Sequence, residues 1–174
     1  MAEAGLLLNR SLDDSKVHPD KLGKPLVIGQ LRFKTWASAA NPTAEVLDGT
    51  GVTSLVALGT TNTTTAGTID VPRDGVYRLR LALGQVSSAS ASGVMTFALQ
   101  NNSAALSAPS ILKLLQPAVA ANFMSGVCEQ VVSLVKGDSI RAVVTGTVGG
   151  VITVEEGVLT VEMLGDDLDN VTQV

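Results

Sequence analysis

The feature that most constrains the fold is a strict alternation of apolar and polar residues in TIDVPRDGVYRLRLALGQ, residues 68–85. Successive side chains of a β-strand point to opposite faces of a sheet, so this segment predicts one half-buried strand introduced by a turn. Pro72 and Gly75 supply the turn chemistry. The outward face would carry Arg78 and Arg80, either solvated, which is the simpler interpretation, or paired with carboxylates of a neighbour. The predicted inward residues are Tyr77, Leu79, Leu81 and Leu83.

Alternating or β-prone segments recur along most of the chain. They are LRFKTW (31–36), VTSLVAL (52–58), the threonine-rich 59–68, VMTFAL (94–99), GVCEQVVSLV (126–135), SIRAVVTGT (139–147), VGGVITVEEG (148–157) and VLTVEML (158–164). Together they predict roughly eight or nine short strands, which is typical of an all-β sandwich.

Two connections carry their own predictions. KGD (136–138) lies between two alternating runs, so we expect a hairpin in which Gly137 takes a positive φ. Residues 104–121 are apolar without clear alternation, and Pro109 and Pro117 bracket only seven residues. That spacing favours a short helical turn or an apolar loop over a full helix.

The first part of the chain differs from the rest, because residues 1–29 neither alternate nor show a helical pattern. We interpret them as an N-terminal arm and residues 30–174 as the β domain. Such an arm needs the body of its own chain or a neighbouring subunit to hold it in place. The apolar residues available for that contact are Leu6, Leu7, Leu8, Leu12 and Val17.

The composition indicates a covered surface. Charged residues make up 16% of the 174 residues, below the usual quarter, while hydrophobic residues make up 45% and aromatic residues only 3%. A surface with so few charges favours contact with copies or partners. The net charge of −4 argues against a nucleic-acid partner. No run approaches the about 20 apolar residues of a membrane span, and we expect neither membrane insertion nor secretion.

Few residues suggest catalysis or metal binding. His18 is the single histidine and lies in the arm, where no rigid scaffold would hold it beside a nucleophile. The acidic run DDLDN (166–170) has the alternate spacing of calcium ligands, but it lacks the glycine turn and the distal glutamate of a calcium loop. A solvated acidic tail is the simpler interpretation. We therefore expect no enzyme activity, no metal and no cofactor.

Two single residues leave alternatives open. Trp36 could stack on a sugar, although a lone tryptophan at a strand end is more often core or interface. Cys128 stands alone, which excludes an internal disulfide, and its place in an alternating run favours a buried structural thiol over a reactive one.

The order of the segments resembles the jelly-roll heads of the complement and tumour-necrosis-factor superfamily. VPRDGVYRLRLALG is followed by a strand ending in QNNSAAL, then by VVSLVKGDSIRAVV and by GVLTVEML. The last strand departs from that family, which often has Phe followed by Gly where this chain has Leu159, Thr160 and Val161. The residues that carry the resemblance most specifically, and that we expect to define the fold, are Gly75, Tyr77, Leu134, Gly137 and Asp138.

This resemblance implies an all-β jelly-roll β-sandwich with an extended N-terminal arm, as in small trimeric heads of bacteriophage particles. The implied function is that of a homotrimeric capsid decoration, or cement, protein. It would be made in the host cytoplasm, join the virion, and stabilise the shell by docking its arm on the major capsid protein or another virion protein. The alternative is the tip of a tail or head fibre that binds a host receptor or glycan. A fold alone does not carry a function, so both remain expectations.

Overall fold

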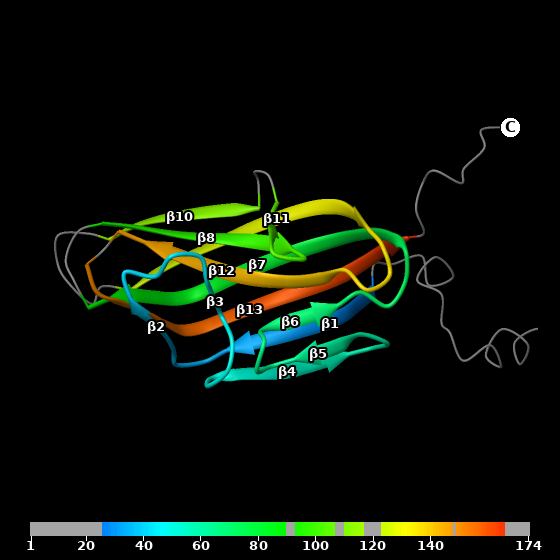
Figure 1. Cartoon of the computed structure of the whole chain (residues 1–174), viewed down its shortest axis with the longest axis horizontal. Coiled ribbons are helices and arrows are strands. Elements are labelled where there is room, and N and C mark those ends of the chain that lie inside the picture. The colour runs from blue at the N-terminus through cyan, green and yellow to red at the C-terminus, as the bar shows by residue number, and fades with distance from the viewer. Residues whose placement is uncertain (1–25, 90–92, 107–109, 117–122, 148, 166–174) are drawn as a thin grey trace, which may run out of the picture.

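The structure of the chain is a computed structural model that describes residues 26–89, 93–106, 110–116, 123–147 and 149–165. These residues form thirteen strands and no helix, and every strand pair is antiparallel (Figure 1). The all-β prediction is confirmed. β1 begins at Leu26, so residues 26–29, which we assigned to the arm, belong to the sheet.

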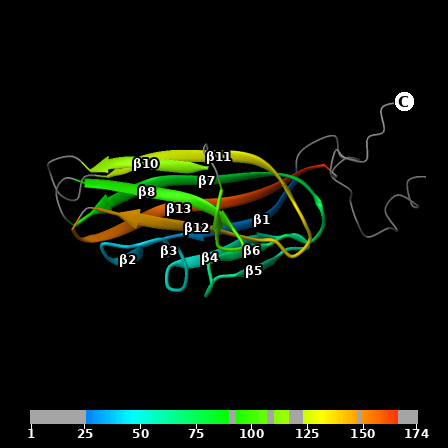
Figure 2. The same cartoon turned by 45° about the horizontal axis from the view of Figure 1, so that its top comes forward.

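Two sheets pack face to face as a jelly-roll sandwich (Figure 2). Sheet A has the order β11 (Met124–Leu134), β7 (Gly75–Ser88), β13 (Val151–Gly165), β1 (Leu26–Phe33), β4 (Val52–Ala57), with β2 (Trp36–Ala40) beside β13. Sheet B has the order β10 (Ile111–Gln116), β8 (Gly93–Asn101), β12 (Ser139–Gly146), β6 (Thr68–Asp70), β5 (Thr61–Thr63), with β3 (Glu45–Val46) beside β12 and β9 (Ala104–Ala105) beside β8. The outermost strands β10 and β11 therefore form one edge of the sandwich, and β4 and β5 form the opposite edge.

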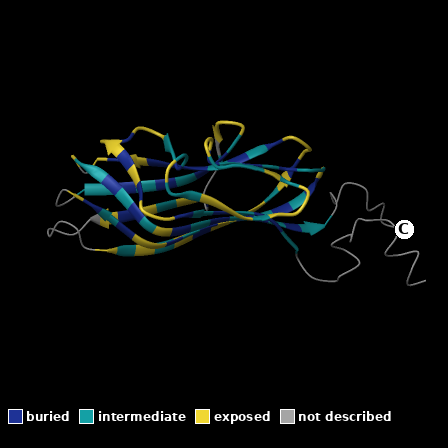
Figure 3. Ribbon diagram, turned by 90° about the horizontal axis from the view of Figure 1, so that it is seen from below, coloured by how far each residue is buried: buried dark blue, intermediate teal, exposed yellow. Residues whose placement is uncertain are grey.

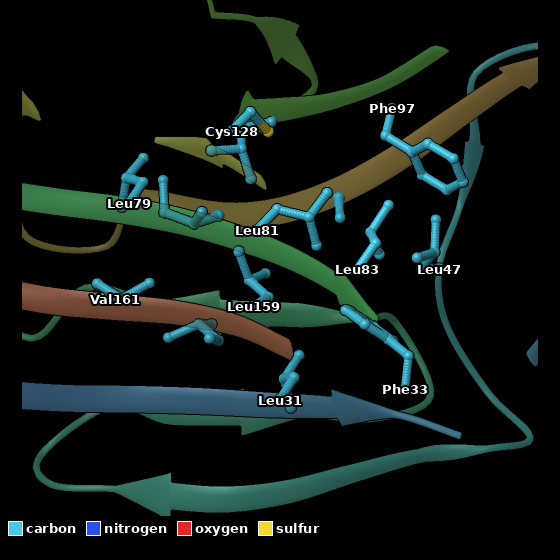
Figure 4. Packing of buried hydrophobic residues seen from close by; sticks show 14 of the residues in the cluster. Leu31, Phe33, Leu47, Leu79, Leu81, Leu83, Phe97, Cys128, Leu159 and Val161 are labelled. Carbon is cyan, nitrogen blue, oxygen red and sulfur yellow. The ribbon is translucent and has the colours of Figure 1, made fainter. Parts of the chain in front are cut away.

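The core fills the space between the sheets. Exposed and buried residues alternate along the strands (Figure 3), and the inward leucines, valines and phenylalanines interleave there (Figure 4). The predicted inward face of β7 is confirmed, because Tyr77, Leu79, Leu81 and Leu83 are all buried. Each fully buried aliphatic side chain contributes about 1.5–3 kcal/mol, so a core with few aromatic rings is sufficient.

Residues 68–85 do not form a single strand. β6 ends at Asp70 in sheet B, and β7 begins at Gly75 in sheet A. Residues 71–74 cross the sandwich between them. Pro72 suits this crossing because it lacks the backbone N–H that a continuing ladder would need.

The predicted hairpin through KGD is wrong. β11 pairs with β7 in sheet A, whereas β12 pairs with β8 and β6 in sheet B, so residues 135–138 join the two sheets. Gly137 has the expected positive φ, at 90°. The chain can pass from one sheet to the other at this turn because the strands on both sides bury their apolar faces in one core. Leu134 before the turn and Ile140 after it are both buried.

The helical turn or loop predicted for residues 104–121 is also wrong where the structure describes the segment. Residues 104–105 and 111–116 are strands, and β10 pairs with β8 in regular register from Ile111 to Gln116. Apolar and polar residues alternate only weakly in this segment because β10 carries apolar residues on both of its faces. Leu114 is buried, while Ile111 and Leu115 are exposed. Residues 107–109 and 117–121 lie outside the described part.

Candidate assembly surface

Two crossings between the sheets meet in one corner of the sandwich. Residues 71–74 lead from β6 to β7, and residues 135–138 lead from β11 to β12. The two are tied together: Gly137 N donates to Val71 O over 2.9 Å, and Val71 N donates to Asp138 O over 2.8 Å. Lys136 N donates to Asp74 Oδ1 over 2.7 Å. We call residues 71–74 and 135–138 the corner.

The five residues singled out by the resemblance lie in or beside this corner. Asp138 is 8% exposed, and its carboxylate accepts hydrogen bonds from Asn102 Nδ2 and Val135 N. The buried Tyr77 donates from its hydroxyl to Arg73 O over 2.7 Å. Leu134 is buried, and a Cβ added to Gly75 would lie 2.7 Å from Gly165 O. These contacts hold the corner of the scaffold together.

Among the described residues, the largest group of exposed apolar side chains lies along the edge made by β10 and β11. Their exposed fractions run from 39% to 73%, and we call this group the apolar rim. Its members are Ile111, Leu115, Phe123, Val127, Val131 and Val135. Exposed apolar side chains that gather at one edge are typical of contact sites, so this edge is the candidate.

The rim follows from strand alternation at the edge of each sheet. On β11, Val127 and Val131 face outward because Cys128 and Leu134 face the core. Among the described strands β11 hydrogen-bonds only to β7, in regular register from Gly126 to Leu134, and its sequence contains neither lysine nor proline. An edge strand of this kind is only weakly protected against association, because Glu129 is its one charged residue and its register shifts only between Met124 and Gly126. The signal was present in the sequence, since an outward-facing valine recurs at every fourth residue.

The opposite edge carries a smaller patch. Leu55 is 50% exposed and Leu58 is 56% exposed, and we call these two residues the opposite patch. The register between β1 and β4 shifts beside Leu55, which makes this edge irregular. Asn62 of β5 links this edge to its neighbours by hydrogen bonds. Its Nδ2 donates to Ser54 Oγ over 2.9 Å and to Gln30 O over 3.3 Å.

Charged groups on the outer face of sheet A pair within the chain. Arg78 contacts Glu162 at 3.0 Å and Glu129 at 3.5 Å, both in its own chain, and its side chain is still 38% exposed, so this arginine is both paired and partly solvated. The guanidinium is positioned by the register, in which Val131 and Glu162 flank Arg78 on the two neighbouring strands. Arg80 is exposed, as expected.

The single tryptophan and the single cysteine are both structural. Trp36 is buried, and its Nε1 donates to Asp48 O over 3.1 Å, which removes it as a sugar-stacking platform. Cys128 is 5% exposed, and burial raises the pKa of its thiol to about 11. A thiol with so high a pKa is a poor nucleophile near neutral pH.

Several candidate residues fall outside the part of the chain that the structure describes. They are His18, the acidic residues 166–170, and the arm residues Leu6, Leu7, Leu8, Leu12 and Val17. Within the described ranges, no group of three His, Cys, Asp or Glu side chains could hold a metal ion. A search of the same ranges finds no helix long and apolar enough to cross a membrane.

Comparisons with known proteins agree with this architecture. No protein-family model matches the chain, and no curated protein matches it. Among solved structures, the globular domain of zebrafish complement 1qA protein matches with a TM-score of 0.57 and 14% identity, over 81% of this chain and 99% of that one. This chain has the jelly-roll fold of such heads. The resemblance inferred from the segment order is therefore confirmed at the level of fold.

Two further solved structures match at 14% identity. The PRD1 vertex protein P5 has a TM-score of 0.51 over 80% of this chain and 99% of that one. The Eiger TNF from S. frugiperda has a TM-score of 0.49 over 87% of this chain and 100% of that one. At 14% identity, the matches to the complement domain and to P5 show the fold alone.

Proposed function

We propose that the protein is a structural virion protein that self-associates, as a homotrimer, and decorates a capsid to which its N-terminal arm attaches it. The observation that carries this proposal is the apolar rim. Six large apolar side chains on one edge of an otherwise well-packed sandwich would be a liability on a monomer, and contact between copies covers them.

A structural neighbour supports a place on a particle. The PRD1 vertex protein P5 is, by its name, a protein of a vertex, and it shares the jelly-roll fold with this chain. The described residues add support of a different kind, because their polar contacts in the corner brace the scaffold. Such a scaffold suits a protein whose work is to hold position on a shell.

The arm is the part proposed to reach the shell. Residues 1–25 directly precede β1, which lies inside sheet A between β13 and β4. The arm would therefore be anchored at a rigid point of the domain. Fixing the backbone of a chain segment costs about 1–2 kcal/mol per residue, and burial of the arm's leucines and valine on a neighbouring virion protein would offset that cost. The arm residues for this contact are Leu6, Leu7, Leu8, Leu12 and Val17.

Two measurements test the proposal. Native mass spectrometry of the purified protein should give the mass of a trimer, and a monomer at micromolar concentration would contradict self-association. Particles lacking the protein should then be incubated with the full chain or with a variant lacking residues 1–25. We expect the shortened variant to remain trimeric but to lose particle binding.

A deletion at the other end of the chain, of residues 166–174, serves as the control and should leave binding intact. Replacement of the five apolar arm residues with serine, at unchanged length, should reproduce the loss. Unchanged occupancy of the particles after removal of residues 1–25 would refute the role of the arm.

A further inference from the structure

We propose that, in the protein free of particles, residues 6–8 of the N-terminal arm pack on the opposite patch of their own chain. We call residues 6–8 the leucine run. Docking of the arm on a shell would then require the leucine run to leave the patch. This inference rests on the proposed role of the arm and names the surface that the arm covers before it meets a particle.

The opposite patch lies beside the point where the arm joins the domain. β1 begins at Leu26, and β4 is its antiparallel neighbour in sheet A (Figure 1). Leu58 N donates to Ile28 O over 2.7 Å, which places this leucine next to the start of β1. Leu55 follows at about 10 Å from Leu58 along the chain, at the usual rise of a strand. The patch is therefore the exposed apolar surface that adjoins the end of the arm.

The arm is long enough to turn back onto the patch. Residues 9–25 would connect the leucine run to β1. A segment of that length spans up to about 60 Å when extended, several times the about 10 Å that separates the two leucines of the patch. A tether between two surfaces raises their effective concentration toward the millimolar range. In dilute protein, a contact within one chain is therefore favoured over the same contact between two chains.

The chemistry of the two surfaces matches. The sequences of β4 and β5, VTSLVA and TNT, contain no charged residue, and residues 5–9 of the arm contain none either. Residues 13–24 of the arm carry several charged side chains, which would lose their solvation on an uncharged apolar surface. The leucine run is therefore the part of the arm that fits the patch.

The contact would be made by side chains, because β4 is a poor template for adding a strand. The register between β1 and β4 shifts beside Leu55, and Asn62 Nδ2 donates to Val56 O, so one backbone acceptor of this edge is already occupied. Successive side chains of an extended segment point to opposite sides, so three consecutive leucines present apolar atoms whichever side faces the patch. Leu55 and Leu58 are 50% and 56% exposed, which leaves apolar surface for them to contact.

The alternative is that the shell itself covers the patch. The patch would then stay exposed to water until a particle is present, although an apolar segment of the same chain lies within reach. The apolar rim is not an occupant within the same chain, because it lies on the other edge of the sandwich (Figures 1 and 2). The two alternatives differ in the free protein, where only the first predicts a contact.

Cross-linking within one chain tests the contact in the absence of particles. The double variant Asn9→Cys/Ala57→Cys places one thiol beside the leucine run and the other at an exposed residue next to Leu58. We expect a short thiol-specific cross-linker to join them in a product with the mass of one chain. The two single variants and the wild type, whose Cys128 is buried, are controls that should give no such product.

Arg80→Cys in place of Ala57→Cys provides a matched control site. Ala57 pairs with Gly29 of β1. Arg80 is exposed and pairs with Thr160 of β13, which in turn pairs with Gln30 of β1. Both sites are at the same level of sheet A and within reach of the arm, so only a specific contact distinguishes them. We expect the cross-link from Asn9→Cys to form at least about tenfold faster at Ala57→Cys, and replacement of the leucine run with serine should remove the difference.

Equal rates at the two sites, or a product with the mass of two chains, would overturn the proposed contact. If the variant lacking residues 1–25 still fails to bind particles in that case, the role of the arm stands and only its contact in the free protein is wrong. If the cross-link forms but particle binding does not need residues 1–25, the contact stands and the proposed function is wrong.

A particle-binding measurement tests the competition between patch and shell. The variant Leu55→Ser/Leu58→Ser should bind particles several-fold more tightly than the wild type, because its arm no longer has to leave the patch. The substituted residues are half exposed, so the domain should keep its fold. Unchanged or weaker binding would overturn the competition.

Discussion

Asn102 donates a hydrogen bond from its Nδ2 to Oδ1 of Asp138 over 2.6 Å, and this contact ties the turn after β8 to the corner between β11 and β12. The other carboxylate oxygen of Asp138 accepts from Val135 N over 3.0 Å, and Asn102 Oδ1 accepts from Ser139 N over 2.9 Å. One buried carboxylate and one amide thus link the turn after β8 to residues 135–139. We infer that these bonds decide the stability of the corner.

Asp138→Asn tests the carboxylate at constant size. An amide nitrogen would face either Asn102 Nδ2 or Val135 N, both of which are donors, so one bond must be lost at a site that is 8% exposed. We expect the free energy of unfolding, measured with urea, to fall by about 1–3 kcal/mol. Glu156→Gln is the control with the same chemical change at the surface, where the loss should stay within about 0.5 kcal/mol. Equal losses in the two variants would contradict the role of Asp138.

Gly75→Ala tests the close approach of strands at the start of β7. An added Cβ would lie 2.7 Å from Gly165 O and 2.9 Å from Met163 Cε, and the first of these is backbone that cannot easily move. We expect a loss of about 1–3 kcal/mol in the free energy of unfolding. Gly165→Ala, where nothing lies within 4 Å of the added atom, should be close to neutral. A neutral Gly75→Ala would mean that the two strands separate at little cost.

Cys128 predicts a pH dependence of stability at the alkaline end. Burial raises the pKa of its thiol from the ordinary value of 9.0 to about 11, so between these values the unfolded chain loses the proton that the folded chain keeps. The stabilisation is fully present below pH 9 and is lost as the pH rises toward 11, by about 2–3 kcal/mol over the whole interval.

Urea unfolding of the wild type and of Cys128→Ala between pH 8 and 11 measures this effect. As the pH rises, the free energy of unfolding of the wild type should fall relative to that of Cys128→Ala. A difference that stays constant with pH would show that the thiol titrates at its ordinary value.

Leu115→Glu tests the rim on the side of sheet B. Leu115 is 73% exposed, so the substitution should change the free energy of unfolding of a single copy by no more than about 0.5 kcal/mol. In an assembly it would bury an unpaired carboxylate, and we expect the oligomer to dissociate at concentrations where the wild type stays assembled. Analytical ultracentrifugation measures the shift. Ala37→Glu adds the same charge at an exposed residue of β2, away from both edges, and should leave the oligomer intact.

The alternation in the sequence was enough to predict the β class and the buried face of β7, and the turn residues predicted the positive φ of Gly137. These features are local, because side-chain direction in a strand depends only on the two-residue period. The same reasoning failed at residues 104–121, where β10 exposes Ile111 and Leu115. An edge strand that places apolar residues on both faces loses the alternation by which strands are recognised.

The assignment of strands to sheets was not accessible in the same way. The KGD turn has the residues of a hairpin, but Leu134 and Ile140 bury their side chains between two different sheets, so the chain crosses the sandwich. The sequence around Arg78 did not indicate that it pairs with Glu129 and Glu162, because these residues lie 51 and 84 residues further along the chain. The resemblance in segment order predicted the jelly-roll fold, but it did not assign each strand to its sheet.

The sequence alone determined which residues face inward and that the chain is built from strands, since a period of two requires nothing beyond the geometry of the backbone. The tertiary structure alone decided which strands are outermost. An outward-facing valine in the middle of a sheet is partly covered by side chains of the strands on both sides, whereas at the edge one side is open. The exposure of Val127, Val131 and Val135 therefore depends on the strand order.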